Sequence, residues 1–319
     1  MSSAVSGNGP GASIALHTAT DALPWGALRP TRAAAFFIGS FGRKLVRGSF
    51  RKRLYRVLSR ISPAFDIEAS GGLRLRCSIG DNATEMRMLS RPERLLTHIA
   101  RITDDLAPGD TFVDLGANVG VFSLYAAKAV GPQGCVLAIE PSPTMLQRLR
   151  FNLAANGFNN VRIAPVAVGA ARGQATFHTL PDAHGSASLH RMPGSSPHMT
   201  VPVETLVSLL SAQGIERIDA MKVDIEGYED RALLPFFAEA PRSLWPRRIF
   251  METLGRGKRW ERDCVAHLLD LGYRIEWQSS MDALLVLPAQ WGRPGGRLDR
   301  PERRSLYRPR FLRRSSSVG

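Results

Sequence analysis

Two short segments of the chain combine apolar residues, carboxylates and glycine in a way that allows chemistry. Residues 114–120 read Asp-Leu-Gly-Ala-Asn-Val-Gly, and residues 222–229 read Lys-Val-Asp-Ile-Glu-Gly-Tyr-Glu. Each follows the pattern of an apolar strand and its end, and an open α/β sheet binds ligands at the carboxyl ends of its strands. The first loop can hold a nucleotide-like cofactor, and the second brings carboxylates and a lysine to whatever reacts with it. The pair predicts an enzyme.

The first segment favours one kind of cofactor over another. Gly116 and Gly120 allow the backbone to approach a ligand closely, and Glu140 ends the next strand about twenty residues on, where an acid can accept both ribose hydroxyls. A dinucleotide would need glycine in place of Asn118, and Asp114 would repel a pyrophosphate. An acid there suits an ammonium group instead. S-adenosyl-L-methionine, an adenosine with a cationic amino-acid tail and no phosphate, is therefore the predicted cofactor.

The same residues resemble a known family. The segments 114–120 and 222–229, with Glu-Pro at 140–141, are similar to those of the FkbM-type S-adenosylmethionine-dependent methyltransferases. The likeness covers about residues 75–290 and leaves both ends of the chain outside it. It implies an α/β, Rossmann-like class I methyltransferase fold, with a mainly parallel seven-stranded sheet and helices on both faces. It also implies O-methylation of a hydroxyl, often on a sugar, a glycan or a polyketide-derived ring of a secondary metabolite.

The resemblance implies roles for particular residues as well. Glu140 would hold the ribose, Ala167 and Val168 would flank the adenine, and Asp224 and Glu226 would face the transferable methyl group. Four residues of the first segment would line the methionine part of the cofactor: Asp114, Gly116, Asn118 and Gly120.

Transfer of a methyl group to a hydroxyl calls for a base. An aliphatic hydroxyl is a poor nucleophile, and a positioned base adds ~10²–10⁴-fold to the rate. Asp224 is the first candidate, with Glu226 beside it. Lys222 either takes a direct part or forms an ion pair that orients Asp224. His184 and His190, in a loop rich in Ser, Pro and Gly, are further candidates.

Other residues that could bind metal or form disulfides do not form a recognisable pattern. Asp224, Glu226 and Glu252 have oxygen ligands suited to a divalent cation, but no metal-ligand spacing requires one, and no metal is predicted. The cysteines lie far apart without a CxxC pair, which predicts free thiols and a reducing compartment such as the cytoplasm. They are Cys77, Cys135 and Cys264.

The elements that must position these residues alternate along the chain. Strands are predicted over 111–115, 135–140, 161–168, 174–180, 220–225, 248–253, 273–278 and 283–287, the last as an antiparallel partner. Helices are predicted over 91–106, 121–130, 143–156, 203–211, from 226 to about 238, and 260–271. Residues 181–200 are predicted to be a loop. This alternation implies a mainly parallel sheet that is covered on both faces.

The basic charge of the chain, +14 overall, is concentrated at its ends. Residues 1–60 carry ten Lys/Arg and one acid, and residues 291–319 carry nine Arg and two acids, so the middle is nearly neutral. Four regions are predicted: a basic, largely disordered extension (1–60), a cap region (61–106), the FkbM-type methyltransferase domain (107–290) and an Arg-rich disordered tail (291–319). The spacing of apolar and basic residues over 41–61 is typical of an amphipathic helix on an anionic membrane surface. An arm docked on the domain and an organelle transit peptide fit the same composition.

Two other functions fit parts of the sequence. One is a non-catalytic methyltransferase-like scaffold that is tethered to a membrane by its basic arm, although Asp114, Glu140, Asp224 and Glu226 are all present. The other is a nucleic-acid methyltransferase, with the Arg-rich ends as its electrostatic footprint. The acceptor strand lacks the Asn-Pro-Pro-aromatic type of motif used on bases. Nucleic acid is therefore not the expected partner; a hydroxyl-bearing small molecule or glycan is.

Overall fold

A computed structural model describes residues 22–32, 34–36, 57, 62–79, 82–180, 183–189 and 196–288. Apart from Val57, the amphipathic helix predicted over 41–61 lies outside these residues, and so does the tail predicted over 291–319. The boundaries of the four predicted regions therefore stay a prediction.

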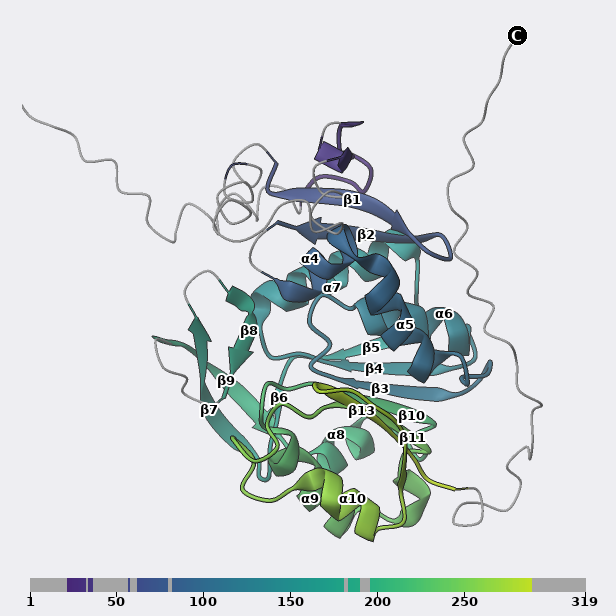
Figure 1. Ribbon diagram of the computed structural model, residues 1–319, viewed down its shortest axis with the longest axis vertical. Helices are drawn as coiled ribbons and strands as arrows, with labels where there is room; N and C mark the ends of the chain where they lie inside the picture. The colour runs from purple at the N-terminus through teal and green to yellow at the C-terminus, as the bar shows by residue number, and fades with distance from the viewer. Residues whose placement is uncertain are drawn as a thin grey trace, which may run out of the picture.

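The described residues form a central sheet of seven strands in the order β12-β13-β11-β10-β3-β4-β5 (Figure 1). Neighbouring strands are parallel except at β13, which runs antiparallel to both β11 and β12. The α/β class, the mainly parallel sheet and the antiparallel last strand are thus confirmed. The strands are β3 (Thr111–Leu115), β4 (Cys135–Ile139), β5 (Val161–Ala164), β10 (Ala220–Val223), β11 (Arg248–Glu252), β12 (Arg274–Gln278) and β13 (Asp282–Val286).

Helices cover both faces of this sheet because successive strand residues point to opposite sides. Val113 and Leu115 of β3 belong to the core under α8 (Leu206–Ala212), α9 (Glu229–Glu239) and α10 (Cys264–Asp270). Phe112, which precedes Val113, packs on the other side with α5 (Pro92–Thr103) and α6 (Val121–Val130). On that side α7 (Pro143–Asn156) and α4 (Ala83–Ser90) complete the layer.

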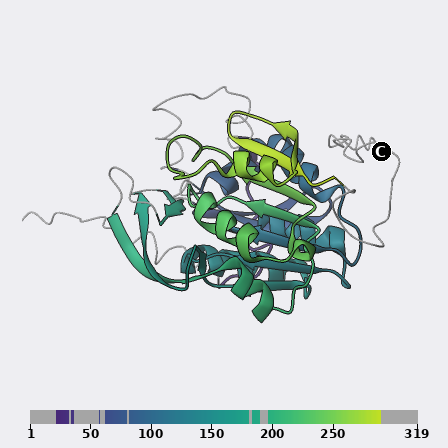
Figure 2. The same cartoon turned by 90° about the horizontal axis from the view of Figure 1, so that it is seen from below.

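A second sheet stands beside the central one and corrects the sequence prediction. Its order is β6-β9-β7-β8, and it projects from one side of the molecule (Figure 1, Figure 2). The predicted strand 161–168 is two strands, of which β6 joins this second sheet, and the predicted loop 181–200 contains strands. Backbone pairing between distant residues overrides the weak strand propensity of Ser, Gly and Pro there. β7 and β9 are paired from Gly173 opposite Val203 to Thr179 opposite Ser196. The strands are β6 (Ala167–Val168), β7 (Gly173–Leu180), β8 (Ala183–Ser188) and β9 (Ser196–Glu204).

Side-chain caps decide where the helices begin. α7 begins as predicted, with Pro143 at its first position and Ser142 as its cap. The helix predicted from residue 260 begins only at Cys264, because Asp263 accepts hydrogen bonds from the Val265 and Ala266 amides and so ends the preceding turns. Within the described ranges, no helix is both long and apolar enough to cross a bilayer.

A hairpin formed by β1 (Ala64–Ala69) and β2 (Leu73–Ser78) lies outside α7 (Figure 1). Part of the N-terminal region is attached to it. The Asp66 carboxylate accepts hydrogen bonds from the Gly26 and Leu28 amides, while Arg76 donates to two backbone carbonyls, those of Leu23 and Pro24. Asp66 and Arg76 are themselves a buried ion pair with a 2.7 Å contact. Residues 22–30 therefore pack on the hairpin.

Candidate functional site

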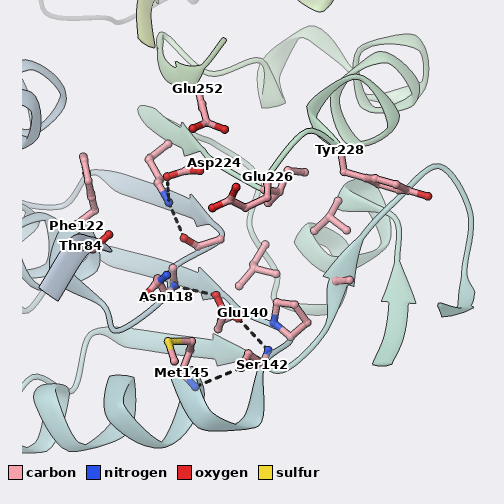
Figure 3. Close-up of a pocket in the computed structure, with 18 of the residues that line it drawn as sticks. Thr84, Asn118, Phe122, Glu140, Ser142, Met145, Asp224, Glu226, Tyr228 and Glu252 are labelled. Atoms are coloured by element: carbon pink, nitrogen blue, oxygen red, sulfur yellow. Dashed lines mark hydrogen bonds and ion pairs between the residues drawn. The ribbon is translucent and has the colours of Figure 1, made fainter. Parts of the chain in front are cut away.

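A cavity of about 270 Å³ opens at the carboxyl ends of β3, β4, β10 and β11 (Figure 3). Both segments that the sequence singled out end here, as expected for an open α/β sheet. The N-terminal end of α4 closes one side, held to α7 by a buried ion pair between Glu85 and Arg148. Phe177 of β7 closes another side. The site thus lies between the central sheet, α4 and the second sheet.

The glycines of the first loop serve packing within the protein. Gly116 has φ +75°, and a Cβ on it would lie 1.9 Å from the carbonyl oxygen of Asp224. Gly120 has φ +86°, and a Cβ there would lie 2.3 Å from Leu149 of α7. Gly116 lines the cavity, but Gly120 does not. The structure shows close approach of both glycines to neighbouring elements, and their predicted contact with a ligand stays a prediction.

Glu140 is held at one end of the cavity by backbone amides. Its carboxylate accepts hydrogen bonds from the amides of Asn118 and Ser142, both at 2.9 Å. Burial raises the pKa of Glu140 to about 7, although the two amide hydrogen bonds oppose the shift. Asn118 itself has φ +54°, a left-handed conformation that Asn tolerates better than most residues. The loop conformation therefore points an amide at Glu140.

Asp114 lies beneath the cavity and does not line it. The side chain is fully buried, accepts a 2.6 Å hydrogen bond from Ser123 and lies 3.4 Å from the ammonium of Lys222. The resemblance implied contact with the cofactor for Asp114, but its contacts in the structure are with these two side chains. Its nearest link to the cavity is the contact with Lys222, which lines it.

Lys222 links the two loops. Its ammonium donates to the carbonyl oxygens of Leu115 and Gly116 and lies 3.7 Å from the Asp224 carboxylate. Burial alone would lower the pKa of Lys222, but the nearby carboxylates, first among them Asp224 and Asp114, outweigh it and raise that pKa. The ammonium of Lys222 is therefore placed to pair with Asp224, as the second of the two roles that the sequence left open would require, and the role itself stays a prediction.

The far end of the cavity gathers carboxylates. Figure 3 shows Asp224, Glu226 and Glu252 around one space, away from Glu140 (Figure 3). Burial, and then repulsion from Asp224, raise the pKa of Glu226 to about 7 and that of Glu252 to about 9. Asp282 of β13 lies opposite Glu252 of β11 in the antiparallel strand register. Burial raises the pKa of Asp282 as well. Arg259 and Lys222 oppose the shift of Glu226, but burial and repulsion outweigh them, so both glutamates hold a proton to higher pH than a free carboxyl does.

Apolar residues complete the walls in two groups. One group comes from the end of β4, the start of α7 and the segment before β7: Ile139, Met145, Val166, Ala167 and Val168; the other comes from α6 and the loops after β10, β11 and β12: Phe122, Tyr228, Leu254 and Met281. Ala167 and Val168 had been predicted. Asn82 and Thr84 of α4, like Met145 and Met281, come from distant parts of the chain and carry no local pattern that could have revealed them.

The structure gives less information on the other residues that the sequence raised: the loop histidines, the possible metal ligands and the cysteines. The side chain of His184 and all of His190 lie outside the described part of the structure. Across the residues that the structure describes, no three His, Cys, Asp or Glu side chains are placed to hold a metal ion. All three cysteines are free, with Cys77 and Cys264 buried.

This sheet order, with a cavity at its carboxyl edge between an acid-ended strand and a carboxylate-bearing loop, defines an α/β methyltransferase. Residues 114–275 match the Methyltransferase FkbM domain. The chain therefore belongs to the FkbM methyltransferase family. The predicted family is confirmed, and with it S-adenosylmethionine as the cofactor.

Individual relatives cover parts of the chain. Methyltransferase sdnD of Sordaria araneosa is 29% identical over 153 residues, covering 38% of this chain and 59% of that protein. The 31-O-demethyl-FK506 methyltransferase FkbM of Streptomyces tacrolimicus is 26% identical over 172 residues, covering 45% and 64%. The chain thus spans about three fifths of the length of these relatives. A crystal structure of methyltransferase FkbM from Methylobacillus flagellatus aligns with 16% identity and a TM-score of 0.37, covering 63% of this chain and 53% of that one.

Proposed function

We propose that this methyltransferase acts on a hydroxyl oxygen of a sugar, a glycan or another secondary metabolite. The observation that carries the proposal is Asp224, which lines the cavity with its side chain 45% exposed and has the ammonium of Lys222 beside it. That cation stabilises negative charge on Asp224. The result is a carboxylate that an acceptor can reach.

The cavity has the groups that the cofactor needs. Glu140 would hold the ribose hydroxyls, the backbone of 116–118 would lie along the methionine part, and the apolar group that includes Ala167 and Val168 would flank the adenine. S-adenosylmethionine supplies an electrophilic methyl group on a cationic sulfonium. The carboxylate of Asp224 suits that positive charge, and a nearby cation would favour the charged forms of Glu226 and Glu252 as well.

Asp224 has the base role in this proposal. It would accept the proton that the acceptor hydroxyl gives up on methylation; the methyl group would come from the sulfonium of S-adenosylmethionine, whose sulfur would leave as a neutral thioether. Lys222, 3.7 Å from this carboxylate, would keep it turned toward the cavity. Glu226 and Glu252, with raised pKa values, form the acidic wall that receives the acceptor and can pass the proton onward. The printed name of the Streptomyces tacrolimicus relative describes methylation of an O-demethylated compound, which also supports oxygen as the acceptor atom.

The test is a transfer assay with isotope-labelled S-adenosylmethionine. The purified chain is incubated with panels of hydroxylated sugars, glycosides and polyketides, and with amines, thiols and RNA. We expect labelled methyl ethers only in the hydroxyl panels. Labelled amines or RNA in place of ethers would contradict the proposal, and failure to bind S-adenosylmethionine in calorimetry would favour a scaffold.

Asp224→Asn is the matching variant. Loss of the base is expected to slow transfer by ~10²–10⁴-fold, while calorimetry shows cofactor affinity close to that of the unchanged chain. Asp270→Asn, an exposed acid on α10 far from the cavity, is the control and should leave both unchanged. Full turnover by Asp224→Asn would remove this residue as the base.

A further inference from the structure

The loop that follows β10 has an unfavourable backbone conformation, which contacts with other residues must stabilise. Glu226 has φ +56° and Gly227 has φ +97°. The left-handed region is unfavourable for a residue with a Cβ, and it persists only where the surroundings fix it. Glu226 also lines the cavity next to Asp224. The shape of this loop therefore decides where two carboxylates of the site point.

The group that fixes the shape is Glu229, the first residue of α9. One oxygen of its carboxylate accepts hydrogen bonds from the amides of Ile225 and Gly227, both at 3.1 Å, on either side of Glu226. The other oxygen accepts a 2.7 Å hydrogen bond from the indole of Trp260. Glu229 is fully buried and does not line the cavity, so no substrate reaches it.

Trp260 connects this loop to the segment after β11. The indole nitrogen lies against Gly255, where a Cβ would be only 2.2 Å away. The neighbouring Arg259 donates a 3.1 Å hydrogen bond to the carbonyl oxygen of Glu226. Leu254, in the same segment, lines the cavity. The carboxylate of Glu229 thus connects the loop after β10 to the segment after β11, and residues of both segments line the cavity.

We infer that Glu229 is a positioning residue, which holds the Asp224–Gly227 loop in its productive shape and ties that loop to the 254–260 segment. The sequence alone offers a simpler role, since a carboxylate in the first turn of a helix is favourable without any function. Asp230, the next residue, is equally buried, but its carboxylate accepts from the amide of Glu261 and contacts neither amide of the loop. The two neighbours therefore separate helix stabilisation from loop positioning.

The consequence for catalysis rests on the proposed function, but the structural claim does not. Amide hydrogen exchange of the full chain tests it without any acceptor. In Glu229→Ala the amides of residues 225 and 227 lose their acceptor, and their exchange is expected to rise at least about tenfold, while β3 and β4 stay protected. Asp230→Asn is the matched control and should leave these two amides unchanged.

Two milder variants guard against loss of folding. In Glu229→Gln the amide oxygen can still accept from the loop, but the amide nitrogen faces the indole N–H of Trp260, so only that contact is lost. Trp260→Phe removes the same hydrogen bond and keeps a ring. Both should give an intermediate rise in exchange at residues 225–227. Exchange equal to that of Asp230→Asn in all three variants would overturn the proposal.

Cofactor binding and transfer supply the second readout. Because Glu229 acts on the base and not on Glu140, the Kd for S-adenosylmethionine should stay within about threefold in Glu229→Gln while kcat falls at least about tenfold on an acceptor found in the transfer assay. A parallel loss of cofactor affinity would mean a general structural role instead. If the unchanged chain transfers no methyl group, the proposed function fails, and amide exchange still decides the positioning role.

Discussion

The carboxylates at the two ends of the cavity have different surroundings. At the cofactor end, Glu140 receives two backbone hydrogen bonds from neighbouring loops. At the reacting end, the ammonium of Lys222 pairs with Asp224, and repulsion from Asp224 adds to burial in raising the pKa values of Glu226 and Glu252, although Arg259 opposes the shift of Glu226. The carboxylate at the cofactor end is held by hydrogen bonds, whereas the two glutamates at the reacting end retain protons to higher pH because they lie near other carboxylates.

This difference separates binding from chemistry. A carboxylate that is held by backbone amides is rigid and can recognise hydroxyl groups. Carboxylates that repel one another are poised to accept a proton or a cation. The two ends meet at Gly116, whose Cα lies against the carbonyl oxygen of Asp224. Substitutions at the junction, at the cofactor end and at the reacting end should therefore have different effects on stability and on cofactor binding.

The largest effect is expected at the junction. In Gly116→Ala a Cβ would lie 1.9 Å from a backbone oxygen that cannot rotate away, at a φ that costs about 1–2 kcal/mol by itself. We expect a loss of at least ~3 kcal/mol in the free energy of unfolding, measured by urea denaturation, and weaker cofactor binding as well.

Gly157→Ala is the control for that experiment. Its φ is +67°, and nothing lies within 4 Å of an added Cβ. It should lose only the roughly 1–2 kcal/mol of the left-handed conformation. Equal losses in the two variants would show that the contact between the loops does not matter.

An intermediate effect is expected at the cofactor end alone. In Glu140→Gln the side-chain NH2 group would face the backbone N–H of either Asn118 or Ser142, so one hydrogen bond would be lost. The hydrogen bonds from the ribose hydroxyls to this side chain would also weaken. Hydrogen bonds to charged groups contribute about 1.5–3 kcal/mol, so the Kd for S-adenosylmethionine in calorimetry should rise roughly 10–100-fold. Glu68→Gln, an exposed position on β1, should leave it unchanged. An unchanged Kd in Glu140→Gln would refute the ribose role.

The smallest effect is expected at the reacting end and depends on pH. The folded pKa of Glu252 is about 9, well above the usual glutamate value of 4.5. Between these values the unfolded chain gives up a proton that the folded chain keeps, so this group lowers the stability as pH rises. Glu252→Gln should therefore be more stable than the unchanged chain at pH 8 by at least about 1 kcal/mol, with the gap closing toward pH 4.5.

Unfolding at several pH values checks this expectation. Glu239→Gln, an exposed position at the end of α9, should show no gap that depends on pH. If the gain in stability of Glu252→Gln over the unchanged chain were no larger at pH 8 than at pH 5, the raised pKa of Glu252 would be contradicted.

Local chemistry made much of the fold predictable. The helices 121–130 and 143–156 were confirmed at both ends, because a glycine or a Ser-Pro pair starts each one and glycine ends each one. The second sheet was missed because residues 181–200 have turn-like composition, and only pairing with β7 makes strands of them. The helix predicted from residue 260 began late because the turns that bring Trp260 to Glu229 occupy its first residues.

The sequence by itself determined the alternation of strands and helices in the central sheet, the acids and glycines at the strand ends, and from these the family and its cofactor. Tertiary structure alone decided which groups meet. It placed Gly116 against Asp224, moved Asp114 beneath the cavity, brought α4 and Met281 into the walls, and turned Glu229 back onto the loop before it. The physical reason is that propensity and capping act within a few residues, whereas burial, repulsion and close packing depend on contacts between segments far apart in the chain.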